Sequence, residues 1–158
     1  MELFNDLLAY PDDIISVLFH HTEKDSPLCT TVKVGNVAMA KDLIEKGALV
    51  NDKKYLHYTL LQMAISSRSL PMVSLLVSKG ASVDVQDRWG NSPLHTSARA
   101  GSTEVTSILV HRSGANVNMK GYDEDTPLHV AIDHGHMDIA AILIDAGAKV
   151  YYKTEIFQ

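Results

Sequence analysis

Residues 89–118 read WGNSPLHTSARAGSTEVTSILVHRSGANVN, and this stretch decides the fold because three other segments of the chain repeat its pattern. It begins with the motif Ser-Pro-Leu-His at 92–95, which leads into a short apolar segment that ends at Gly101. A second apolar segment follows, and the stretch closes with Gly-Ala-Asn-Val-Asn at 114–118. A unit that recurs at one spacing predicts a chain built from stacked copies of one structural element.

The leucine of the opening motif recurs at Leu28, Leu61, Leu94 and Leu128, in steps of 33, 33 and 34 residues. Each copy has a Ser or Thr two positions before this leucine and ends with a Gly-Ala pair. Together the period, the start and the close resemble the ankyrin repeat. The resemblance implies an all-α solenoid of stacked helix-turn-helix units with projecting hairpin loops. It implies a scaffold and does not identify what the scaffold binds.

Each copy reads as a helix, a tight turn, a second helix and an extended loop. In the third copy, Pro93 suits the first turn of a helix, Gly101 suits the turn, and Ser102 or Thr103 is expected to cap the second helix. The second helices carry apolar residues at helical spacing, which we expect to be buried. These stripes are Met39, Leu43 and Ile44; Met72, Leu75 and Leu76; Val105, Ile108 and Leu109; and Ile139, Ile142 and Leu143.

The whole chain of 158 residues is expected to form one domain with a short tail at 153–158. The four repeats are expected at about 26–52, 53–87, 88–120 and 121–152. Residues 1–25 depart from the repeat pattern, but they place apolar residues at helical spacing on both sides of Pro11. We expect them to form a helical hairpin that caps the first repeat, because a solenoid must cover its ends. The alternative is an amphipathic helix that binds a partner.

Several positions depart from the repeat pattern. Gly90 stands where a loop tip favours glycine, but His57 and Glu124 occupy the matching positions, so each costs about 1 kcal/mol if its φ angle is positive. Arg68 replaces the glycine between the two helices of the second repeat. The third repeat has one extra residue among 111–113, which we expect to lengthen its second helix and to distort the stacking locally.

The composition excludes several classes of partner and location. The formal net charge is -5 and no run of five like charges occurs, so the chain lacks the basic patch that duplex nucleic acid requires. Its apolar runs are too short to span a membrane, and its N-terminus lacks the pattern of a signal peptide. The single cysteine, Cys29, cannot form an internal disulfide. We therefore expect a cytoplasmic or nuclear protein that binds neither nucleic acid nor membranes.

Catalytic and metal sites find little support in the sequence. His129, His134 and His136 form a loose cluster with two nearby aspartates. However, His95 and His129 occupy the repeat motif, and the resemblance implies that histidines at this position form structural hydrogen bonds. Cys29 occupies the same column of the first repeat, where a small buried residue is a simpler interpretation than a nucleophile. No glycine-rich phosphate loop is present. We expect no catalysis, no cofactor and no metal, and a metal- or thiol-dependent enzyme stays a remote alternative.

The remaining candidate for function is a surface that binds another protein. The resemblance implies that partners bind to the loop tips and to the exposed positions of the first helices. Trp89 is expected at an exposed tip, and aromatic residues and arginine dominate protein interfaces. The candidate partner-binding residues are Lys53, Tyr55, Leu56, Tyr58, Arg88, Trp89, Asn91, Arg99, Tyr122, Asp123, Asp125 and Asp133. The alternative for the aromatic residues is that they shield neighbouring tips from each other.

We expect protein–protein recognition by an inhibitor or a regulatory subunit. In size the chain resembles the small I-kappa-B-like inhibitors of transcription factors and the ankyrin-type inhibitors of cyclin-dependent kinases. The alternative is an adaptor or activating subunit of a larger complex, such as a kinase activator, and the sequence does not choose because these proteins share one architecture. No helix pair follows the last repeat to cover Ile142 and Ile144, so weak self-association through the C-terminal face is expected unless residues 149–158 cover it.

Overall fold

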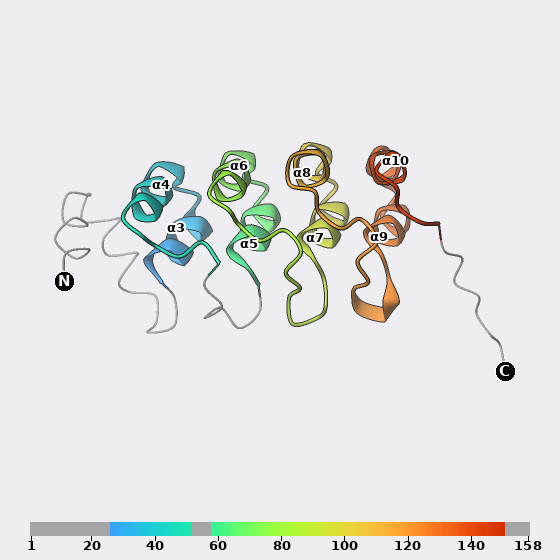
Figure 1. The fold of residues 1–158 in the computed structure, drawn as a ribbon, viewed down its shortest axis with the longest axis horizontal. Helices are drawn as coiled ribbons and strands as arrows, with labels where there is room; N and C mark the ends of the chain where they lie inside the picture. The colour runs from blue at the N-terminus through green and yellow to red at the C-terminus, as the bar shows by residue number, and fades with distance from the viewer. Residues whose placement is uncertain (1–25, 52–57, 151–158) are drawn as a thin grey trace.

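The computed structural model describes residues 26–51 and 58–150, which form four pairs of helices (Figure 1). The pairs are α3 (Pro27–Val34) with α4 (Val37–Glu45), α5 (Leu60–Ser66) with α6 (Leu70–Ser78), α7 (Pro93–Ala100) with α8 (Thr103–Ser107), and α9 (Pro127–Asp133) with α10 (Met137–Asp145). Two shorter elements are η1 (Ile108–Arg112) and η2 (Tyr122–Glu124). The predicted cap at 1–25, the loop at 52–57 and the residues from 151 onward lie outside the described residues.

The helix pairs stack in a single row from α3 to α10 (Figure 1). The first helices α3, α5, α7 and α9 form one layer beside the projecting loops, and the second helices form the other layer. Contacts run between neighbouring repeats, since α5 packs against α3 and α7, and α7 packs against α9. Every regular element in the described part of the chain is helical, which confirms the predicted all-α repeat fold.

The first helices begin alike because the repeat motif supplies their caps. The Thr59 hydroxyl accepts a hydrogen bond from the backbone N–H of Gln62, whose side chain accepts in return from the backbone N–H of Thr59. In α7 the Nδ1 atom of His95 accepts from the backbone N–H of Ser92 at 3.0 Å, and His129 does the same in α9 at 3.1 Å. These bonds satisfy N–H groups that have no partner within the helix.

The cap expected for the second helix of the third repeat is wrong in detail. Ser102 stands at the N-cap of α8, but its side chain makes no capping hydrogen bond. The Thr103 hydroxyl donates instead to Asp138 Oδ2 at 2.6 Å, which links the start of α8 to the start of α10. This bond also stabilises the ionised carboxylate and lowers the pKa of Asp138. A residue that could cap its own helix therefore serves the contact between repeats.

A continuous apolar core runs between the two layers. The four motif leucines are each 2% exposed or less, as the repeat register predicts. Two residues of each predicted stripe are also buried, namely Met39, Leu43, Met72, Leu76, Val105, Leu109, Ile139 and Leu143. The third member of each stripe is only half-buried, namely Ile44, Leu75, Ile108 and Ile142. The core is therefore a narrower strip than the sequence pattern suggests.

The extra residue of the third repeat is absorbed in a π-helix, η1. In the other repeats the alanine of the Gly-Ala close donates its N–H to the leucine five positions earlier, as Ala81 does to Leu76. In the third repeat Ala115 donates to Leu109, which lies six positions earlier. Both Leu109 and Ala115 stay buried at 0% and 7% exposure. The wider helical turn thus confines the predicted distortion to the helix and keeps the core contacts in register.

Two of the predicted departures from glycine produce positive φ angles. Arg68 adopts a φ of 54° in the turn between α5 and α6, where the first and third repeats have Gly35 and Gly101. Glu124 adopts a φ of 62° at the tip of the fourth loop, and its neighbour Asp123 has a φ of 53°. Non-glycine residues adopt this left-handed conformation at a cost, and Arg68 Nη2 donates a hydrogen bond to the carbonyl of Ala100 at 3.1 Å. His57, the other predicted departure, lies outside the described residues.

A polar residue in each loop ties it to the next loop. Asn51 Nδ2 donates to the carbonyl of Gly80 at 2.8 Å, and Asn51 Oδ1 accepts from the backbone N–H of Ser82 at 2.8 Å. Asn118 makes the same pair of bonds to the loop after α10. Between them, Asp84 accepts a backbone N–H of the following loop at 2.9 Å. These bonds hold successive loops in step along the stack.

Candidate protein-binding surface

One residue of each central first helix holds the loop of the repeat that follows. Gln62 Nε2 donates to the carbonyl of Asn91 at 2.8 Å, and His95 Nε2 lies 3.0 Å from the carbonyl of Asp125. Because Nδ1 of His95 accepts the N–H of Ser92, its ring proton is on Nε2, which donates to this carbonyl. The loop tips are therefore fixed relative to the helices.

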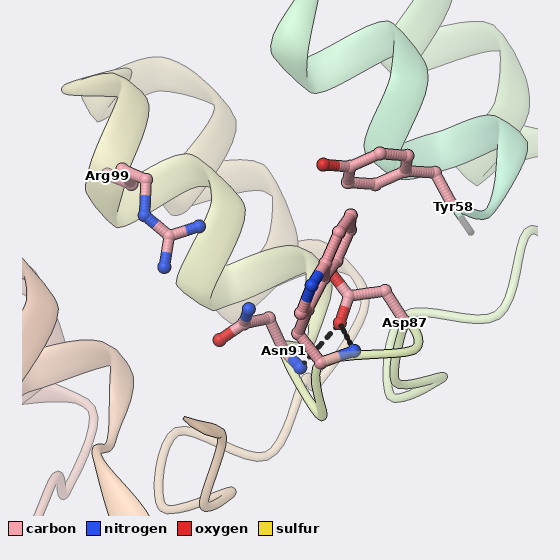
Figure 2. Close-up of a pocket in the computed structure, with 5 residues that line it drawn as sticks. Tyr58, Asp87, Asn91 and Arg99 are labelled. Carbon is pink, nitrogen blue, oxygen red and sulfur yellow. Dashed lines mark hydrogen bonds between the residues drawn. The ribbon is translucent and has the colours of Figure 1, made fainter. Parts of the chain in front are cut away.

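The tip of the third repeat is ordered by its own hydrogen bonds. Asp87 Oδ1 accepts from the backbone N–H groups of Trp89 at 2.9 Å and Asn91 at 2.8 Å (Figure 2). Gln86 Nε2 donates to a carbonyl of its own tip at 2.6 Å and to the carbonyl of Lys120, in the fourth loop, at 2.8 Å. The surface around this tip is thus preorganised, which lowers the entropic cost of binding.

Tyr58, Trp89 and Arg88 form a small stack on this edge. The ring centroids of Tyr58 and Trp89 are 5.1 Å apart with a 50° tilt, and the Arg88 guanidinium carbon lies 4.2 Å from the centroid of the Trp89 ring. The tilted rings and the cation over a ring face are both favourable geometries. The stack joins the second repeat to the third, and Tyr58 still exposes 40% of its surface.

Two open hollows lie on either side of Tyr58. One has a volume of about 310 Å³ and is lined by Tyr58, Asp87, Trp89, Asn91 and Arg99 (Figure 2). The other has a volume of about 320 Å³ and is lined by Lys33, Tyr58, Met63, Ser66 and Ser67. Both are lined by Tyr58, and their other lining residues come from α3, α5, α7 and the third loop tip, so we call the surface that contains both hollows the groove. Such a surface can receive the side chains of an extended partner segment.

The structure brings only some of the predicted site residues together. Tyr58, Trp89, Asn91 and Arg99 meet around one hollow. The exposed residues Asp123 and Asp133 belong to the fourth repeat, away from this hollow, and Asp125 is half-buried. Four predicted side chains lie outside what the structure describes, namely those of Lys53, Tyr55, Leu56 and Tyr122.

The sequence interpretation was wrong about the solvent exposure of two residues. Asn91 is only 7% exposed, because its backbone is held by Gln62 and Asp87. Trp89 is half-buried in the stack with Tyr58 and Arg88, and the sequence had placed it at an exposed tip. The alternative that tip aromatics shield one another therefore has support, although it leaves part of the Tyr58 surface available for contact.

Sequence reasoning also missed three residues that line the hollows: Lys33, Met63 and Asp87. A signal for Lys33 exists in the repeat register, because residues 33, 66 and 99 occupy matching positions on α3, α5 and α7. No comparable signal marks Met63 or Asp87, whose roles depend on how the second and third repeats stack.

The residues considered for catalysis occupy structural positions. Cys29 is 1% exposed, and its Sγ lies 4.0 Å from Met63 Sδ. His95 is fully buried, and this burial lowers the pKa of its imidazole below the ordinary value of 6.5. The rings of His134 and His136 stack with centroids 6.3 Å apart. Within the described residues, no group of three or more His, Cys, Asp or Glu side chains is arranged to hold a metal ion.

Comparison with known proteins agrees with the geometry. The family model described as "Ankyrin repeats (3 copies)" matches residues 2–87 and 79–154, which together span most of the chain. The chain belongs to the ankyrin repeat family. Ankyrin repeats are modules for protein–protein interaction.

Relatives of this ankyrin repeat chain differ widely in their names. Potassium channel GORK of Arabidopsis thaliana is 40% identical over 82 residues, which is 52% of this chain and 10% of the channel. The NF-kappa-B p105 subunit of Rattus norvegicus is 29% identical over 97 residues, 58% of this chain and 10% of that protein. The probable 26S proteasome regulatory subunit p28 of Saccharomyces cerevisiae is 28% identical over 111 residues, 69% of this chain and 45% of the yeast protein. The matched part is thus less than half of each relative.

None of the helices in the described ranges 26–51 and 58–150 is both long and apolar enough to cross a membrane.

The last repeat exposes apolar side chains at the C-terminal end of the stack. Ile132, Met137, Ile144 and Val150 are 46%, 61%, 49% and 58% exposed in the described part of the chain. We expect removal of residues 151–158 to lower the melting temperature or the solubility, or to increase self-association, because uncovered apolar surface favours contact. Melting curves and light scattering of the full-length and truncated chains check this, and identical behaviour would show that these residues do not cap the repeat.

Proposed function

We propose that this ankyrin repeat protein binds a partner protein without catalysing a reaction, through the groove beside Tyr58 and the loop tips, and that it acts as an inhibitor or a regulatory subunit. The observation that carries the proposal is the preorganised edge of the second and third repeats, where a half-exposed tyrosine separates two hollows. Rigid aromatic and arginine side chains beside hollows are typical of interface hot spots.

The regulatory role is supported by relatives whose names place them in larger assemblies. One is a subunit of nuclear factor NF-kappa-B and another is a probable regulatory subunit of the 26S proteasome. We therefore favour a role in a cytoplasmic or nuclear complex, with an inhibitor and an assembly adaptor as the two forms of that role. Identification of the captured partner distinguishes them, because an inhibitor lowers its partner's activity whereas an adaptor joins two proteins.

Replacing Trp89 by alanine is expected to weaken partner binding by about 2 kcal/mol or more, roughly thirty-fold, as loss of a hot-spot residue does. The partner is first captured from the native organism with the wild-type chain, and its affinity is then measured by calorimetry for Trp89→Ala and Tyr122→Ala. Because Trp89 packs against Tyr58, a melting curve of each variant must accompany the affinity.

The matched control is Lys41→Ala, on the outer helix α4, where Lys41 forms only a surface ion pair with Glu45 at 3.9 Å. This control is expected to leave affinity unchanged. If Lys41→Ala weakens binding while Trp89→Ala and Tyr122→Ala do not, the partner uses the opposite face and the proposed surface is wrong.

A further inference from the structure

The groove on the first three repeats is lined by cations at matching repeat positions. Lys33 at the end of α3 and Arg99 at the end of α7 lie in the same column, with Ser66 of α5 between them. All three residues are exposed. Lys33 and Ser66 line one hollow, and Arg99 lines the other. No acidic side chain within the described residues forms an ion pair with Arg99.

One carboxylate among the described residues, that of Asp87, lines this groove and is already hydrogen-bonded. Asp87 Oδ1 accepts two backbone N–H groups of its own tip, so it orders the tip and is not available to pair with Arg99 through that atom. Arg88 adds a further cation over the Trp89 ring. Among the described residues around the groove, Lys33, Arg88 and Arg99 are cationic and Asp87 is anionic, although the whole chain has a net charge of -5.

The fourth repeat carries a negative charge at the position that matches Lys33 and Arg99. Asp133 of α9 matches Lys33, Ser66 and Arg99. The fourth tip carries the exposed carboxylates of Asp123 and Glu124, of which Glu124 pairs with Lys120. A negatively charged partner segment is therefore attracted over α3, α5 and α7 and repelled over α9. The apolar side chains that line the groove also lie outside the fourth repeat, because Tyr58 and Met63 belong to the second repeat and Trp89 to the third.

We propose that this groove binds an extended acidic segment of a protein partner, in which an Asp or Glu carboxylate pairs with Arg99 and a neighbouring apolar side chain enters the hollow between Tyr58, Met63 and Lys33. The inference rests on the proposed function and specifies the chemistry of the partner. Arginine presents a planar fork that matches a carboxylate in two hydrogen bonds, and the aliphatic stem of a lysine can cover an apolar side chain. The carboxylate of Asp133 on α9 disfavours further acidic residues beyond Arg99, so it limits how far the acidic part of the segment extends.

A library of random linear peptides displayed on phage, selected against the full chain, tests this proposal. The wild type is expected to enrich peptides that carry Asp or Glu close to an apolar residue. Arg99→Glu is expected to lose these peptides and to enrich peptides with Lys or Arg at that position. For an enriched acidic peptide, Arg99→Glu should weaken binding about tenfold, Arg99→Lys should weaken it less, and added salt should weaken it for the wild type.

The matched control for the charge reversal is Lys41→Glu on α4, which is expected to select the same acidic peptides as the wild type. Melting curves of both variants exclude misfolding as the cause. The acidic chemistry is overturned if the wild type enriches no peptide, if it enriches peptides regardless of charge, or if Arg99→Glu retains the acidic set. If acidic peptides bind but Tyr58→Ala and Trp89→Ala do not weaken them, the surface named under the proposed function is wrong instead.

Discussion

Replacing Leu94 by alanine is expected to lower the free energy of unfolding by about 2 to 5 kcal/mol, the range for a buried leucine. Leu94 is 1% exposed on α7, which packs against α5 on one side and α9 on the other. Truncation therefore leaves a cavity at the contact between three repeats, which no neighbour can close without moving a whole helix. Leu128, 2% exposed on α9, is expected to show a loss in the same range.

The matched control is Leu49→Ala, which makes the same chemical change at a loop position that is 71% exposed. Its effect should stay within about 0.5 kcal/mol. Urea denaturation followed by circular dichroism gives all three values, provided that the slope of the transition is unchanged. A loss below about 1 kcal/mol for both Leu94→Ala and Leu128→Ala would contradict the repeat register, since a buried leucine costs more.

Replacing His95 by alanine is expected to lower the free energy of unfolding by about 3 kcal/mol, because buried groups then lose their hydrogen-bond partners. The imidazole is fully buried, accepts the backbone N–H of Ser92 and donates to the carbonyl of Asp125. His95→Gln is expected to cost only about 1 kcal/mol, because a glutamine can make both bonds. Gln62 does so in the preceding repeat, where it accepts from Thr59 and donates to Asn91.

The wild type and His95→Gln also test whether the pKa of His95 differs between the folded and unfolded chains. Burial is the largest cause that lowers the pKa of this histidine below 6.5, while its bond to the Asp125 carbonyl acts in the opposite direction. As the pH falls below 6.5, the unfolded chain takes up the proton before the folded chain does, so the wild type loses stability. The stability gap between pH 7.5 and pH 5.5 should be larger for the wild type than for His95→Gln. Equal gaps in urea denaturation at the two pH values would show that His95 titrates alike in both states.

The sequence by itself determined the repeat, the helices and most of the core. These features depend on local spacing: a leucine every 33 or 34 residues, a capping residue two positions before it, and an apolar stripe at helical spacing. The extra residue at 111–113 and the residues that replace glycine were also readable, because each is a departure from a period that the chain itself defines. The form that the insertion takes, a π-helix, could not be read, since it depends on keeping Leu109 and Ala115 in the core.

Only the tertiary structure decided which of the candidate site residues share a surface. Tyr58 and Trp89 are 31 positions apart in the sequence and 5.1 Å apart between ring centroids, because stacking brings matching parts of neighbouring repeats together. The same stacking buries Asn91, which the sequence had assigned to the exposed edge, and brings Met63 to the hollow that Lys33 also lines. A period reveals which residues are equivalent. Exposure and contact depend on the side chains of the adjacent repeat, which differ from one repeat to the next.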